Sequence, residues 1–87
     1  MAIYTGQVAV GTTPTAIDGA DRNPMRIIIH NMDNTKALFI GGNDVSITTG
    51  LEVDKHGQIE IILNPNETIY AITDNGTVQM SYFKQVY

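Results

Sequence analysis

Short segments of alternating apolar and polar residues, separated by turn-forming residues, make up almost the whole sequence. In residues 77–83, for example, Val78, Met80 and Tyr82 share one face of an extended chain, and polar residues lie between them. This period of two is typical of a β-strand that is buried on one side. Strands are predicted over residues 3–10, 15–17, 25–31, 36–40, 45–48, 58–63, 67–73 and 77–83, while residues 51–53 form a short strand or part of a long loop.

Residues 25–31 and 36–40 are apolar on both faces. Ile27, Ile28 and Ile29 are consecutive β-branched residues, which indicates a central strand that is covered on both sides or faces a neighbouring subunit. Residues 67–73 and 77–83 flank Asp74-Asn75-Gly76. Asn-Gly tolerates the positive φ angles of a type I′ turn, so a tight hairpin is predicted there.

The strand signals recur about every ten residues, and no window shows the 3.6-residue period of a helix. The expected fold is all-β: residues 1–87 form one domain, a β-sandwich or jelly roll of seven to nine short antiparallel strands without a long helix. We expect the terminal segments to pack on neighbouring subunits, because a chain this small buries only about 60–65% of its unfolded surface.

The composition argues against two classes of binding partner, nucleic acids and membranes. The formal net charge is −4 with only five Lys and Arg residues, so the clustered cations that nucleic acid requires are missing. The apolar runs are far shorter than the ~20 residues that cross a bilayer, and the N-terminus lacks the basic start of a signal peptide. Neither nucleic acid nor a membrane is an expected partner, and synthesis is expected in a cytoplasm without secretory processing.

The residues that carry chemistry are few. His30 lies on a predicted strand and His56 in a predicted turn, whereas a metal site needs three or four converging ligands. Asp18 and Asp21 flank a loop without the regular spacing of a calcium-binding loop, which leaves an ion there open. The sequence has no Cys and no Ser in a nucleophile elbow. We therefore expect no catalytic residue, no metal, no cofactor and no enzymatic activity.

Large apolar and aromatic residues gather near the two termini. They either close the small core or lie on a neighbouring subunit, where aromatic residues are enriched. The candidate interface residues are Ile3, Tyr4, Phe83 and Tyr87.

An ordered set of segments gives the chain a resemblance to short virion proteins of tailed bacteriophages. The set comprises Val-Gly-Thr-Thr-Pro-Thr-Ala-Ile at 10–17, His-Asn at 30–31, Leu-Phe-Ile-Gly-Gly at 38–42, Thr-Thr-Gly at 48–50, Glu-Thr-Ile-Tyr-Ala-Ile at 67–72 and Gly-Thr-Val at 76–78. The resemblance spans most of the chain.

This resemblance implies a β-sandwich protein of the virion without catalytic residues. The expected function is capsid decoration: a cement protein, present as a homotrimer, that binds the major capsid protein on the outside of the head. The alternative is a tail, baseplate or fibre component. A ligand-binding β module that recognises glycans is a third hypothesis of a different class.

Overall fold

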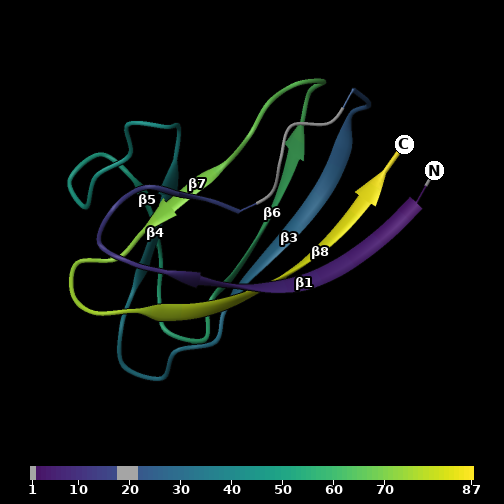
Figure 1. The fold of residues 1–87 in the computed structure, drawn as a ribbon. Coiled ribbons are helices and arrows are strands. Elements are labelled where there is room, and N and C mark those ends of the chain that lie inside the picture. Colours follow the sequence, from purple (N-terminus) through teal and green to yellow (C-terminus); the bar gives the residue numbers. More distant parts are fainter. Residues whose placement is uncertain (1, 18–21) are drawn as a thin grey trace.

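The computed structural model describes residues 2–17 and 22–87, and within these ranges it contains β-strands and no helix. Two antiparallel sheets pack face to face (Figure 1). The larger sheet has the order β1-β8-β3-β6, formed by Ala2–Val10, Val78–Val86, Met25–Asn31 and Gln58–Leu63. The smaller sheet has the order β2-β7-β4-β5, formed by Thr15–Ala16, Tyr70–Ile72, Leu38–Gly41 and Leu51–Val53. The predicted all-β sandwich class is confirmed.

The alternation along each strand of the larger sheet places one set of side chains between the sheets. On β3, Ile27 and Ile29 are completely buried, whereas Ile28 between them is only partly buried. The core contains side chains from both sheets: Val10, Ile17, Ile27, Ile29, Leu38, Ile40, Val53, Ile69, Ala71, Val78 and Met80. Ile59, Ile61, Leu63 and Tyr82 pack against this core, as the alternation on residues 58–63 and 77–83 predicts.

The strand predicted for residues 45–48 is wrong, because this segment forms turns. Gly50 N–H donates to Ser46 O at 2.8 Å, and the Ser46 hydroxyl lies 3.0 Å from the hydroxyls of Thr48 and Thr49. Such local bonds compete with a sheet ladder. The turn brings Val45, which is 5% exposed, against Gly41 of β4.

The hairpin predicted at residues 74–76 is also wrong, because β7 and β8 belong to different sheets. Gly76 has a φ of 68°, but Asn75 lacks the positive φ that a type I′ turn requires. The preceding residue, Thr73, donates its N–H to Gly11 O at 2.9 Å and its hydroxyl to Ala37 O at 3.1 Å. Both partners lie outside β8, and the chain then crosses to the larger sheet.

Asn31, at the end of β3, joins the two sheets through its side chain. It is completely buried, and its Nδ2 donates to the carbonyl oxygens of Lys36 at 3.0 Å and of Val53 in β5 at 3.1 Å. Its Oδ1 accepts the N–H of Asp33 at 2.9 Å. The side-chain amide thus uses both donor hydrogens and its oxygen, as a buried amide must.

The loop that follows Asn31 is ordered by a carboxylate. Asp33 Oδ1 accepts the backbone N–H groups of Thr35 and Lys36, both at 2.8 Å. These two bonds favour the ionised form and hold the pKa of the Asp33 carboxyl below its ordinary value. These bonds place Lys36 where its carbonyl oxygen accepts a hydrogen bond from Asn31 Nδ2.

We predict that Asn31→Ala lowers the free energy of unfolding by about 2–4 kcal/mol, because it leaves buried carbonyl groups without donors. Asn34→Ala is the matched control: Asn34 is exposed, and we expect a change within about 0.5 kcal/mol. Urea unfolding of both variants measures the difference. Equal stability of the two variants would contradict the role given to Asn31.

A second prediction concerns the turn over β4. A Cβ on Gly50 would stand 2.9 Å from atoms of Phe39 and Val45 and 3.0 Å from the Ser46 carbonyl oxygen, so Gly50→Ala should cost about 1–3 kcal/mol. At Gly11 a Cβ would meet nothing within 4 Å, so Gly11→Ala should be neutral or slightly stabilising. Thermal unfolding of the two variants measures the difference in stability. A Gly50→Ala variant as stable as the original protein would contradict the close packing at this turn.

Candidate interaction surface

The outer face of the larger sheet, on the side away from the smaller sheet, is not covered by any described strand. The strand register places on it the residues that alternate with the buried ones. They are Ile3, Thr5, Gln7 and Ala9 on β1, Gln79, Ser81, Phe83 and Gln85 on β8, Arg26, Ile28 and His30 on β3, and Gln58, Glu60 and Ile62 on β6. We call this set the outer face below.

Apolar side chains stand at both margins of the outer face. Ile3 on β1 is 61% exposed and Ile62 on β6 is 67% exposed. Phe83 and Ile28 lie between them as cross-strand partners and are partly buried. Exposed apolar groups that share one sheet face mark an interaction site more strongly than scattered ones.

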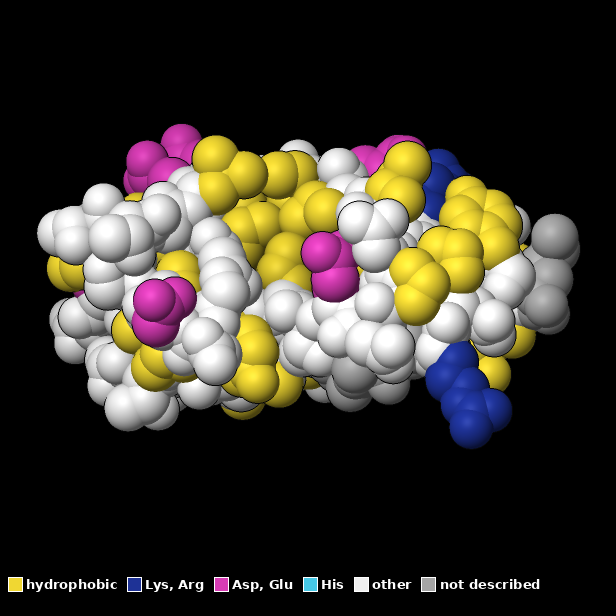
Figure 2. All heavy atoms as spheres, turned by 90° about the horizontal axis from the view of Figure 1, so that it is seen from above, with side chains coloured by type: hydrophobic (Ala, Val, Ile, Leu, Met, Phe, Trp, Pro, Cys, Tyr) yellow, Lys and Arg dark blue, Asp and Glu magenta, His cyan; other side chains and the backbone are white. Residues whose placement is uncertain are grey.

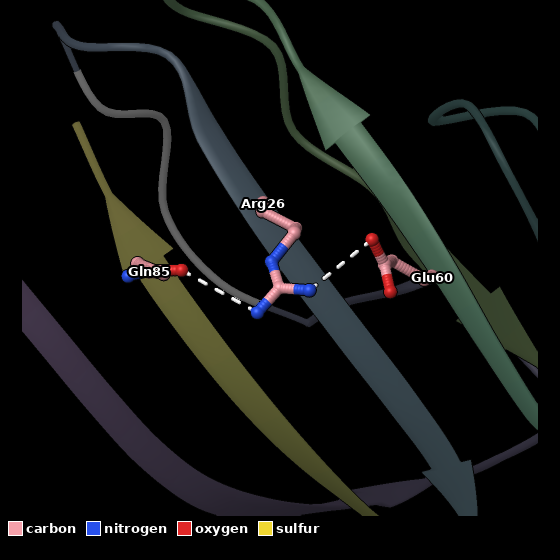
Figure 3. Close-up of polar contacts among 3 residues, drawn as sticks. All are labelled: Arg26, Glu60 and Gln85. Atoms are coloured by element: carbon pink, nitrogen blue, oxygen red, sulfur yellow. Dashed lines mark hydrogen bonds and ion pairs between the residues drawn. The ribbon is translucent and has the colours of Figure 1, made fainter.

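Arg26 lies near the start of β3, in the same row of the outer face as Ile3 and Ile62, and its side chain contacts both neighbouring strands (Figure 3). Its Nη1 lies 3.3 Å from Glu60 Oε2 on β6, and its Nη2 donates to Gln85 Oε1 on β8 at 3.4 Å. The positive charge is therefore balanced on the sheet itself. A partner that covers this part of the face meets no unbalanced charge from Arg26.

Next to Arg26 the sheet is hollowed into a shallow concavity of about 520 Å³. Its lining consists of Thr5, Gly6, Gln7, Ile28, His30, Gln58, Ser81, Tyr82 and Phe83. None of these is an acid, a Lys or an Arg, so the hollow is lined by hydroxyl, amide, imidazole and apolar groups. Gly6 allows Tyr82 to approach, since a Cβ there would stand 2.7 Å from the Tyr82 hydroxyl oxygen.

The two histidines do not meet. His30 lines the concavity, and its Nδ1 is buried without a hydrogen-bond partner among the described residues. His56 is exposed in a turn with a φ of 56°, and its N–H donates to Asp33 O at 3.2 Å. Within residues 2–17 and 22–87, no group of three or more His and acidic side chains is placed to hold a metal ion. The loop carboxylates Asp18 and Asp21 lie outside the described residues.

The four interface candidates from the sequence fall on different surfaces. Ile3 and Phe83 share the outer face. Tyr4 points to the other side of β1, is 52% exposed, and has Lys84 Nζ at 4.9 Å from its ring centroid. Tyr87 is 49% exposed after β8, and its N–H donates to Pro24 O. Their role as contact residues stays a prediction.

Sequence reasoning allowed the strand with Ile28 to face a neighbouring subunit but did not name Ile28 as a contact residue, and it missed Ile62. Both are apolar at positions that alternate with the inward residues of their strands, and Ile62 follows Gln58 and Glu60 on the polar face of β6. The available signal of a contact surface was an apolar residue at a position where the alternation otherwise predicts a polar one. Figure 2 shows hydrophobic side chains along one face of the molecule, with few charged groups among them.

Comparisons with known proteins support the fold and leave the function open. Neither the protein-family models nor the curated proteins match the sequence. Among solved structures, the chain is similar to a Bacillus endospore appendage protein from a family of disulfide-linked pili. The TM-score is 0.57 at 9% identity, and the match covers 97% of this chain and 88% of that one. At this identity the likeness shows a shared fold alone. The part of the chain that the structure describes contains no helix able to cross a membrane.

We predict that Glu60→Gln changes the free energy of unfolding by less than about 1 kcal/mol, because the pair with Arg26 is partly exposed to solvent. The difference from the original protein should shrink further as salt is raised. Glu52→Gln, at an exposed position on the other sheet, is the control. A salt-independent loss of about 3 kcal/mol would mean that this pair stabilises the fold.

Proposed function

We propose that the protein is a structural component of a tailed-bacteriophage particle, and specifically a capsid decoration protein. It binds the major capsid protein on the outside of the head through the outer face and holds neighbouring coat subunits together. The observation that carries this proposal is the sheet face that no described strand covers, with apolar side chains at its margins and the charge of Arg26 balanced by Glu60.

The chemistry of that face suits docking. Ile3, Ile62 and Phe83 offer apolar area, and the amides of Gln58 and Gln85 offer hydrogen bonds around it. Protein interfaces combine apolar area with direct hydrogen bonds, and Phe and Arg residues are enriched in them. Binding that favours the mature shell lowers the free energy of that state, and many copies on one shell add their contributions.

A tail, baseplate or fibre component is the second candidate. The likeness to a pilus protein favours it, because that protein builds a filamentous appendage. The pili are disulfide-linked, whereas this chain has no Cys and cannot form such links. The position of the protein on purified particles, seen by immunogold labelling, separates head from tail.

A glycan-binding module is the third candidate, and the concavity favours it. Phe83 could stack on a sugar ring while the amides of Gln7 and Gln58 bind its hydroxyl groups. A glycan array separates this hypothesis from the other two. Binding at micromolar concentration would favour it over decoration.

The decisive experiment mixes the purified protein with undecorated mature heads of the phage that encodes it. We predict that the protein raises the temperature at which the heads break open. Ile62→Ser should weaken binding about tenfold or more if Ile62 lies in the contact. Phe83→Ser should act in the same direction.

Ile47→Ser is the matched control for this experiment. Ile47 is 47% exposed and lies in the turn near the smaller sheet, away from the outer face. Its variant should bind like the original protein. Absence of binding by the original protein would overturn the proposed function, and loss of binding in the Ile47 variant alone would move the contact to the opposite side.

A further inference from the structure

The outer edge of β1 is a long row of backbone groups without partners in the described structure. Met32 N–H donates to Gln79 O, so β8 bonds to β3 through Gln79 and the residues that alternate with it. In an antiparallel ladder the residues between them then bond to β1. Their partners on β1 are Ala2, Tyr4, Gly6, Val8 and Val10.

The remaining β1 residues, Ile3, Thr5, Gln7 and Ala9, therefore direct both N–H and C=O away from the sheet. Figure 1 shows β1 at the margin of the molecule, with no described strand beyond it. The sequence of β1, Ala-Ile-Tyr-Thr-Gly-Gln-Val-Ala-Val, contains neither a charged residue nor Pro. Soluble proteins usually protect a long edge with one of these, because an unprotected edge pairs with another strand.

The other edges are less suitable. β2 has 2 residues and β5 has 3. On β6, Asn31 N–H donates to Gly57 O, so the outward backbone groups belong to Gln58, Glu60 and Ile62. This edge is shorter than β1 and carries the charge of Glu60. The 9 uncharged residues of β1 thus form the best edge for strand addition.

We propose that β1 pairs antiparallel with β1 of a second copy of this chain, about a two-fold axis beside Gly6. This register pairs all four outward residues: Ile3 lies opposite Ala9, and Thr5 lies opposite Gln7. Each pair exchanges two backbone hydrogen bonds. Any shift of register leaves at least one outward residue unpaired, so the alignment at Gly6 forms the most bonds.

The same register explains two exposed apolar side chains at once. On the outer face, Ile3, which is 61% exposed, meets Ala9 of the second copy. On the other face, Tyr4, which is 52% exposed, lies opposite the partly buried Val8 of the second copy. No charge opposes another in the contact, although each chain carries a net charge of −4. The two larger sheets join into one continuous sheet with both outer faces on the same side.

This pairing is independent of the proposed function and gives a two-fold dimer, in contrast to the homotrimer that the phage resemblance implies. Light scattering on the purified chain distinguishes the two states. Twice the mass of the chain is the expected result. A monomer at millimolar concentration, or a trimer, would overturn the pairing while leaving decoration of the head untouched; a dimer that binds no heads would overturn decoration alone.

Charge exchange tests the register. Thr5 and Gln7 are exposed, so Thr5→Lys/Gln7→Lys should keep the monomer fold, as circular dichroism checks. Like charges then face each other twice, and we expect the dissociation constant of the dimer to rise about tenfold or more. Mixing this variant with Thr5→Glu/Gln7→Glu should restore a mixed dimer.

Gln58→Lys, on the β6 edge of the same sheet, is the control and should leave the dimer intact. Amide hydrogen exchange supplies a direct readout: the N–H groups of Ile3 and Ala9, which the lysine variant keeps, should exchange more slowly in the dimer than in that variant. A dimer that the β1 charges do not weaken, or that Gln58→Lys dissolves, would overturn the proposal.

Discussion

The register of β3 between β8 and β6 is the constraint on which the other features depend. In this register Ile27 and Ile29 are buried between the sheets, while Ile28 and His30 lie on the outer face. A shift of one residue would exchange these sets and expose the core residues. The continuous Ile-Ile-Ile sequence does not by itself determine which of these residues face the core. The choice is determined by Met25 and Asn31, which are buried at the two ends of β3, together with the alternation of the neighbouring strands.

Holding the two sheets in one alignment is the second requirement, because a small sandwich without Cys has no disulfide between them. Asn31 contributes to this link at one end of β3 through its bond to the Val53 carbonyl group. Thr73 adds two bonds, to Gly11 and Ala37, at the point where the chain leaves β7. These buried polar groups bond to specific backbone atoms, so they specify one alignment of the sheets, whereas apolar contacts alone tolerate several.

Local sequence patterns predicted the strands well and their connections poorly. The alternation of Ile59, Ile61 and Leu63 gave the inward face of β6, because side-chain direction in a strand depends only on position. Residues 45–48 alternate apolar and polar side chains as a strand does, but the hydroxyl of Ser46 bonds within a turn that places Val45 against Gly41. Asn75-Gly76 signalled a hairpin, yet the choice of sheet depends on distant strands that no local pattern encodes.

The candidate surface illustrates the same division. The sequence shows Ile3 and Phe83 as apolar residues near the termini. They share a face because Thr5 pairs with Phe83 and Ile3 lies on the same face of β1 as Thr5, and only the fold reveals this pairing. The edge position of β1 also depends on strand order. In the edge strand β1, every second residue bonds to β8 through its backbone. The residues between them direct their backbone groups away from the sheet, and the same residues carry their side chains on the outer face. A strand added there would extend the outer face together with the ladder, so the pairing would cover Ile3 at the edge and leave Phe83 and Ile62 of each copy on a wider continuous face.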